Sequence, residues 1–220
     1  MTQPSPTSRR APIDVFGDWA TQGKDQGMEM GHARAVSNML DYAIGKVSNP
    51  EAFTFLDAGC GNGWVVRKVR ETEGCQQAMG VDGAQAMIDK ARSIDPAFSD
   101  AYECADLLSW APTEPVDLVH SMEVLYYVEN PADLLQQAFE HWIAPGGRLI
   151  LGVDFYLENT VSHDWPAQCG VDTMTLWSQS QWVEAFAAAG FTEIDHWRVD
   201  QGSKPDWEGT LVVTGVVGSP

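Results

Sequence analysis

Short apolar runs alternate with amphipathic segments along the middle of the chain, from residue 53 to residue 153. The apolar runs predict strands at 53–57, 78–82, 101–104, 116–121 and 148–153. Helical patterns lie between them, over about 63–73, 84–93 and 131–143. This alternation is typical of βαβ units, so it predicts a parallel sheet.

The last third of the chain changes this rhythm. Ser178 and Gln181 form a capping-box pattern in front of an apolar helical segment, and Gly190 follows it as a C-terminal cap. Two apolar runs, 191–199 and 210–217, then follow with only a short polar loop between them, which predicts an antiparallel pair at the sheet edge. The predicted fold class is α/β, with a doubly wound, Rossmann-like, mostly parallel seven-stranded sheet, this antiparallel C-terminal edge pair, and helices on both faces.

Two regions flank the predicted sheet. Residues 14–31 are polar and punctuated by glycines, whereas 32–47 show the pattern of an amphipathic helix. Residues 154–177 form a long segment with several large aromatic side chains, and a loop of this length in a compact domain usually carries function. We therefore expect a disordered segment over 1–12 and a single domain over 13–220. Within that domain, 13–50 form a helical cap and 154–177 a substrate-side lid insertion.

Charge and cysteine content narrow the class of protein. The 220 residues include 13 Lys and Arg against 31 Asp and Glu, a formal net charge of −18. Such a surface repels a phosphate backbone, so we expect no nucleic-acid partner; the acidity fits either a cationic partner or a solvated surface. The four cysteines are scattered without a CxxC pair, so neither a disulfide framework nor a metal site is predicted. Without an apolar leader or spanning segment, we expect a cytoplasmic protein with no membrane contact.

A glycine-rich loop is the strongest chemical signal. The predicted first strand ends at Asp57, and the chain then passes through Gly59, Gly61 and Gly63 into a helix. Glycine lets the backbone turn sharply and approach a ligand closely, and the amides of a helix N-terminus can hold an anionic group. Asp82 ends the next strand, where a carboxylate can accept hydrogen bonds from ribose hydroxyls.

The spacing of the glycines bears on the kind of ligand. A dinucleotide-binding loop reads G-x-G-x-x-G, whereas here the third glycine comes one position earlier, at Gly63. This favours a nucleoside ligand without a pyrophosphate. The alternative is that the glycines only form a tight turn and that Asp82 caps the following helix.

With these residues the sequence resembles the class I S-adenosylmethionine-dependent methyltransferases. The resemblance covers about residues 53–153 and rests on five motifs, at 56–63, 81–82, 104–107, 116–122 and 144–149. It implies S-adenosyl-L-methionine as cofactor, S-adenosyl-L-homocysteine as product and a small-molecule acceptor. The late helix and its two closing strands fit the usual end of this family.

The resemblance also implies roles for individual residues. The glycines would approach the methionine and ribose parts of the cofactor, Asp57 would hold the loop or the methionine amine, and Asp82 would bind the ribose. Asp106 would face the adenine, and Met122 would line the sulfonium. Trp19 is added because the segment before the sheet would fold over the cofactor. The expected cofactor-binding residues are Trp19, Asp57, Gly59, Cys60, Gly61, Gly63, Asp82, Gly83, Ala105, Asp106, Leu107 and Met122.

Residues 120–128 lie where the family places its transfer site. They lack the Asn/Asp-Pro-Pro-aromatic tetrapeptide of DNA amino-methylating enzymes, which counts further against nucleic acid. Glu123, Tyr126 and Tyr127 are the catalytic candidates, because they can accept a proton or face a cation, although such positions are as often packing residues. His120 is interpreted as a core histidine. The expected substrate-binding residues are His32, Asp154, Tyr156, His163 and Trp165.

The sequence thus predicts an enzyme that transfers a methyl group from S-adenosylmethionine to an O, N or S atom of a small molecule. Two alternatives remain at this point. One is a nicotinamide-dependent oxidoreductase of the Rossmann type, and the other is a non-catalytic module that binds S-adenosylmethionine. The sequence predicts neither the identity of the acceptor nor the oligomeric state.

Overall fold

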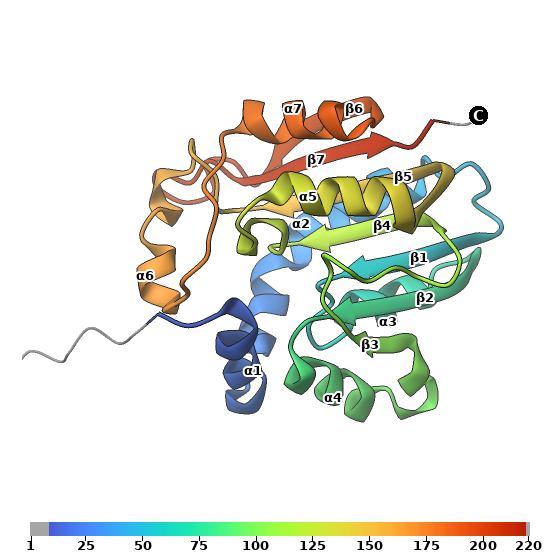
Figure 1. Ribbon diagram of the computed structural model, residues 1–220, viewed down its shortest axis with the longest axis horizontal. Helices are drawn as coiled ribbons and strands as arrows, with labels where there is room; N and C mark the ends of the chain where they lie inside the picture. The colour runs from blue at the N-terminus through green and yellow to red at the C-terminus, as the bar shows by residue number, and fades with distance from the viewer. Residues whose placement is uncertain (1–8, 219–220) are drawn as a thin grey trace, which may run out of the picture.

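The computed structural model describes residues 9–218, and its centre is a seven-stranded sheet in the order β3-β2-β1-β4-β5-β7-β6 (Figure 1). The strands are β1 (Phe53–Ala58), β2 (Cys75–Asp82), β3 (Tyr102–Cys104), β4 (Val116–Met122), β5 (Ile143–Val153), β6 (Thr192–Val199) and β7 (Thr210–Val216). Neighbouring strands are parallel, except that β7 runs antiparallel to both β5 and β6. The predicted fold class is confirmed.

Helices cover both faces of this sheet. They are α1 (Pro12–Gln22), α2 (Asp25–Ile44), α3 (Trp64–Arg70), α4 (Gln85–Ile94), α5 (Pro131–Gln137), α6 (Trp165–Cys169) and α7 (Gln179–Ala189). Shorter helical turns are η1 (Pro96–Ala101), η2 (Leu125–Tyr127), η3 (Ala138–Trp142) and η4 (Thr160–Ser162). No helix within residues 9–218 combines the length and apolar character that a bilayer crossing requires.

Two apolar cores hold the layers together. On one face Leu135 of α5 and Trp182 of α7 are fully buried against the sheet. On the other face Val36 of α2, Val66 of α3 and Ile88 of α4 are fully buried. Burying one such side chain contributes about 1.5–3 kcal/mol, so helix packing on both faces accounts for much of the stability of the fold.

The sheet order creates a crevice at the carboxyl ends of its parallel strands. β1 pairs with β2 on one side and with β4 on the other, so the connections leave these strands in opposite directions. Ligands of open α/β sheets bind outside the carboxyl ends of the strands at such a switch point. In Figure 1 these ends point to the left, where α1 and α6 lie.

The predicted last helix forms as its sequence indicates. The Ser178 hydroxyl accepts from the Gln181 amide, the Gln181 side chain accepts from the Ser178 amide, and Gly190 ends the helix in the left-handed region with a φ of 106°. Other elements differ in length. β2 begins at Cys75, three residues early, and β5 begins at Ile143, five residues early. The helix predicted over 131–143 is α5 followed by the π-helical turn η3.

The N-terminal cap is more helical than its local sequence pattern indicates. Residues 14–31, polar and punctuated by glycines within the predicted helical cap, lie mostly in α1 and in the first turns of α2. Pro12 begins α1, Val15 and Ala20 are buried on it, and α1 packs on α4. These tertiary contacts outweigh the low helix propensity of the glycines.

The expected disordered segment 1–12 is only partly addressed by the structure. Residues 1–8 lie outside the described residues. Arg10, however, forms a β-bridge with Val171 of the 154–177 segment, and its amide donates to the Gly170 carbonyl at 3.0 Å. Arg10 is therefore placed against the insertion and Pro12 already belongs to α1, so the predicted disordered segment does not extend over residues 10–12.

Candidate cofactor and active site

The glycine loop after β1 needs glycine for two different reasons. Gly59, Gly61 and Gly63 all have positive φ angles, of 80°, 53° and 77°. A Cβ on Gly59 would lie 2.1 Å from Val124, and one on Gly63 would lie 2.4 Å from Tyr102. A Cβ on Gly61 would meet no atom closer than 4.0 Å. Gly59 and Gly63 therefore allow close packing, whereas Gly61 faces open space.

Asp82 holds this loop from the neighbouring strand. Its Oδ2 accepts from the Gly61 amide at 2.9 Å, and its Oδ1 accepts from the Ala84 amide at 2.8 Å, at the start of α4. Burial raises the pKa of this carboxyl despite the two hydrogen bonds. Each carboxylate oxygen can accept more than one hydrogen bond, so holding the loop leaves room for ribose hydroxyls as well.

A cavity of about 380 Å³ opens above the loop, within the range of roughly 300–1,000 Å³ typical of small-molecule pockets. Many of the predicted cofactor and catalytic residues line it, namely Gly59, Gly61, Asp82, Gly83, Ala105, Asp106, Leu107, Met122, Glu123 and Tyr127. The loop, the acid after β2 and the residues after β3 and β4 thus meet at one ligand-sized space, although they are far apart in sequence.

A smaller cavity of about 70 Å³ adjoins the first. Both are lined by Gly59, Gly61, Met122 and Glu123, and the smaller one is also lined by His32, Asp57, Cys60, Asn62 and His120. Because the two cavities adjoin and residues of α2 line the smaller one, the space above the glycine loop continues toward α2.

His120 on β4 is part of this wall rather than only a core residue. Its Nδ1 lies 2.7 Å from Asp57 Oδ1 on β1, and both side chains are almost fully buried. Its Nε2 is buried and has no hydrogen-bond partner among the described residues. The sequence-based interpretation as a satisfied core histidine therefore holds for one ring nitrogen and not for the other.

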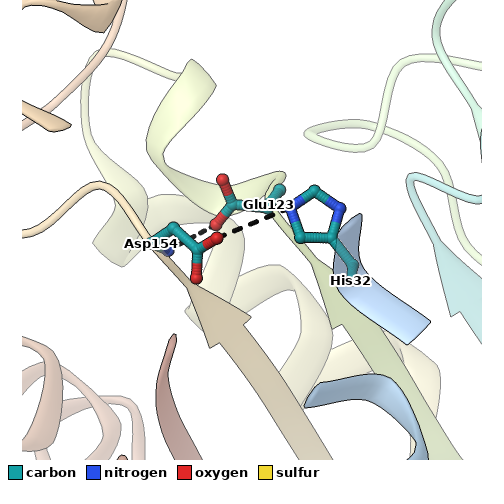
Figure 2. Close-up of side chains that lie close together, drawn as sticks. All are labelled: His32, Glu123 and Asp154. Carbon is teal, nitrogen blue, oxygen red and sulfur yellow. Dashed lines mark hydrogen bonds and ion pairs between the residues drawn. The ribbon is translucent and has the colours of Figure 1, made fainter. Parts of the chain in front are cut away.

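Glu123 sits between the two cavities, directly after β4. Its backbone has a φ of 61°, a strained conformation for a residue with a side chain. One carboxylate oxygen accepts from the Tyr126 hydroxyl at 2.6 Å, and the other accepts from the Asp154 amide. His32 Nε2 of α2 lies 3.5 Å from Asp154 Oδ2, so the three side chains converge (Figure 2).

The buried surroundings shift the pKa values of Glu123 and His32. Burial raises the pKa of Glu123 to about 8, and the negative charge of Asp154 acts in the same direction. Burial lowers the pKa of His32, but the hydrogen bond with Asp154 and the charges of Glu123 and Asp154 outweigh it and raise that pKa overall. Glu123 can therefore exchange a proton near neutral pH, as a general base must.

Several predicted residues line neither cavity. Gly63 packs against Tyr102. Trp19 packs edge-on against Phe16 with ring centroids 5.2 Å apart, and Phe16 rather than Trp19 lines the main cavity. Tyr126 acts on the site only through its hydrogen bond to Glu123.

The predicted substrate-binding residues also differ in whether they reach the cavities. Asp154 lines neither cavity but contacts two residues that do, His32 and Glu123. Tyr156 is fully buried, and its hydroxyl donates to the Gly209 carbonyl at 3.0 Å, so it is a packing residue. His163 is exposed against the Leu157 carbonyl.

Trp165 begins α6 in the same insertion and lies outside both cavities. Of the five predicted substrate-binding residues, the structure therefore brings only His32 and Asp154 to the site. The segment 154–177 carries side chains that pack on the fold and on the N-terminal segment, and the sequence alone did not distinguish these from ligand contacts.

The sequence predicted that the segment before the sheet folds over the cofactor, but it did not indicate most of the residues in that segment that line the main cavity. Pro12, Ile13 and Phe16 of α1 and Met28 of α2 line the main cavity. The apolar positions of α1 and a proline at its first position were the available signal. The glycines that follow obscured it.

Comparisons with known proteins agree with this geometry. Residues 28–196 match the family model described as a methyltransferase domain. A trans-aconitate 2-methyltransferase of Acidovorax sp. (strain JS42) is 30% identical over 164 residues, 74% of this chain and 58% of the relative. A second, from Acidovorax ebreus (strain TPSY), is 31% identical over 66% of this chain and 52% of its own length. The chain thus spans little more than half the length of these curated relatives.

Solved structures of methyltransferases also resemble this chain. The methyltransferase in a complex with the Haloferax volcanii Trm112 methyltransferase activator has a TM-score of 0.75 and 30% identity, covering 92% of this chain and 97% of that one. The N-methyltransferase NodS from Bradyrhizobium japonicum WM9, solved with S-adenosyl-L-homocysteine, has a TM-score of 0.61 at 19% identity, over 82% and 84%, and shares the fold. The chain belongs to the class I S-adenosylmethionine-dependent methyltransferases, whose cofactor is S-adenosylmethionine. This family match favours a methyltransferase over the alternative of a nicotinamide-dependent oxidoreductase.

Proposed function

We propose that this chain transfers the methyl group of S-adenosylmethionine to an O, N or S atom of a small molecule and releases S-adenosylhomocysteine. The observation that carries this proposal is the cavity of about 380 Å³ between the glycine loop, Asp82 and Asp106. Gly61 presents no side chain to that cavity, so its backbone is accessible to a ligand. These features fit an adenosyl cofactor, which supplies an already activated methyl group when bound.

The residues around the cavity would act mainly by positioning. Asp82 and the Gly61 backbone would hold the ribose, and Asp106 would accept from an exocyclic amine of the base. Glu123, which lines both cavities, and His32, which lines the smaller one, would face the acceptor and exchange its proton. Holding two reactants in line contributes about 7–11 kcal/mol to a transfer reaction, so orientation by these walls can supply much of the catalysis.

Calorimetric titration with S-adenosylmethionine, S-adenosylhomocysteine and NADH tests the cofactor. We expect both adenosyl ligands to bind, NADH not to bind, and Asp82→Ala to weaken binding at least tenfold. Asp100→Ala, which removes an exposed aspartate at the end of η1, is the matched control. Thermal unfolding of each variant, together with Asp82→Asn, separates loss of binding from loss of fold. Binding that is unchanged in a folded Asp82→Ala would contradict the proposed ribose contact.

Turnover separates an enzyme from a binding module. A non-catalytic module would bind the cofactor with the same affinity but release no S-adenosylhomocysteine with any acceptor. A coupled assay of S-adenosylhomocysteine release over amines, phenols, thiols and carboxylic acids therefore decides between the two functions.

We also infer a protein partner of the Trm112 type. The supporting observation is the likeness to the methyltransferase of the Trm112 complex, which extends over 97% of that chain. Co-expression with Haloferax volcanii Trm112 followed by size-exclusion chromatography tests this inference. Co-elution in a one-to-one complex is expected, and separate elution under both low and high salt would contradict it.

A further inference from the structure

The walls of the two cavities carry an unusual balance of charge. Their lining includes the acids Asp25, Glu29, Asp57, Asp82, Asp106 and Glu123 and the histidines His32 and His120. No lysine or arginine lines either cavity within residues 9–218. An anionic acceptor would therefore meet negative charge with little compensation.

The nearest cationic side chains are already engaged. Lys90 Nζ lies 2.6 Å from Asp25 Oδ1, so it neutralises one acid of the smaller cavity. Arg67 donates to the Asn62 carbonyl at 2.6 Å. Both groups hold the glycine loop and α2 in place, and neither is available to bind a carboxylate in the cavity.

The group formed by His32, Glu123 and Asp154 leaves one carboxylate oxygen without a hydrogen-bond donor. Both Glu123 oxygens accept hydrogen bonds, and Asp154 Oδ2 lies against His32. Asp154 Oδ1 is buried and has no hydrogen-bond partner among the described residues. Asp154 itself lines neither cavity, so its unpartnered oxygen leaves uncompensated negative charge beside Glu123, and a cation bound at Glu123 would offset that charge.

We propose that the methyl acceptor is a small amine that enters as an ammonium ion and is recognised at Glu123, with His32 and Asp154 beside it. This inference rests on the proposed methyl transfer and specifies its acceptor class. It also separates this chain from its curated relatives, because trans-aconitate is a tricarboxylate. A cation fits these acidic walls, and a trianion does not.

The transfer step balances with the groups present. The ionised Glu123 carboxylate takes one proton from the ammonium, which leaves a neutral amine with a free lone pair. The nitrogen then bonds to the methyl carbon, the carbon–sulfur bond breaks, and its electron pair stays on sulfur as a neutral thioether. The product is a methylated ammonium ion, and Glu123 returns its proton to water through His32 or directly.

The proton exchange gives the step a pH dependence. Besides His32, Asp154 and Tyr126, the ionisable neighbours are Tyr127 of η2, whose ring centroid lies 4.5 Å from that of Tyr126, and Cys169 of α6. Burial and the charge of Glu123 raise the pKa of both groups. Glu123 must be ionised to accept the proton. For a given amine, we therefore expect kcat/KM to rise with pH through the range in which Glu123 ionises.

The experiment compares six defined acceptors: histamine, phenethylamine, ethanolamine, putrescine, citrate and trans-aconitate. S-adenosylhomocysteine release is followed for the wild type, Glu123→Gln, Asp154→Asn and the control Glu184→Gln, whose side chain is exposed on α7. We expect turnover with at least one amine and none with either carboxylate. Glu123→Gln should lower kcat/KM for that amine about 100-fold or more and abolish the rising pH limb, as loss of a general base does. Glu184→Gln should match the wild type.

The possible failures are distinguishable. Absence of S-adenosylhomocysteine binding by calorimetry contradicts the proposed function itself. Intact cofactor binding with methylation of trans-aconitate, or with no amine turned over, overturns the amine inference alone. The ligand atoms of His32, Glu123 and Asp154 lie within 4.8 Å of one another, so a divalent ion is the competing occupant. Activity that requires Mn²⁺ or Zn²⁺ and is lost with EDTA would also overturn the inference.

Discussion

Replacing Glu123 by glutamine removes a buried charge and keeps the shape of the side chain. The glutamine carbonyl can accept from the Asp154 amide, and its NH₂ can donate to the Tyr126 oxygen, so both hydrogen bonds of the native carboxylate have a substitute. The change therefore isolates the ionisation of this one group. Its expected effect appears in the pH dependence of stability.

The magnitude follows from the pKa in the two states. Glu123 ionises near its ordinary pKa of 4.5 in the unfolded chain and at about 8 in the folded protein. Between these values the folded state binds more protons than the unfolded state, so stability falls as pH rises. Each pKa unit corresponds to about 1.4 kcal/mol, which sets a ceiling of about 5 kcal/mol on the total fall. The raised pKa of His32 acts in the same direction, because its stabilisation is complete below about pH 6.5 and is lost at higher pH.

Urea unfolding at intervals from pH 5 to pH 9 measures this difference. We expect the wild type to lose unfolding free energy steeply over that range and Glu123→Gln to lose much less, so that the variant is the more stable protein at pH 9. Glu184→Gln makes the same charge change at an exposed position and should parallel the wild type. Parallel curves for the wild type and Glu123→Gln would refute the assignment of a buried, proton-binding carboxyl.

Two further predictions concern the framework of the site. Gly59→Ala should cost about 3 kcal/mol, because it forces a side chain into the left-handed region and against Val124. Gly23→Ala, with a φ of 74° and no atom within 4 Å, should cost only about 1 kcal/mol. Equal costs in urea unfolding would contradict the packing argument. Ser178→Ala removes the N-cap of α7 and should cost about 1 kcal/mol, a fall in melting temperature of about 2–4 °C. No change in melting temperature would show that the capping box adds nothing.

Most of the fold is encoded in local pattern. Strands and helices of the central region recur at the periods that burial on a sheet imposes, so the parallel order and the antiparallel end were predictable. The meeting of Gly59, Gly61 and Asp82 at one cavity was also predictable, because it depends on backbone geometry and on the ends of adjacent strands. Such features depend on residues close in sequence and on one topological rule.

The acceptor side depended on tertiary structure. The sequence proposed Glu123, His32 and Asp154 separately, but only packing α2 against the ends of β4 and β5 brought them together and gave Glu123 its raised pKa. The packing of α1 on α4 placed α1 over the cavity, and Tyr156 became part of the core. Charge, desolvation and cavity shape arise between segments distant in sequence. The sequence by itself therefore determined the fold class and the glycine loop, and the folded chain decided which polar side chains line the two cavities.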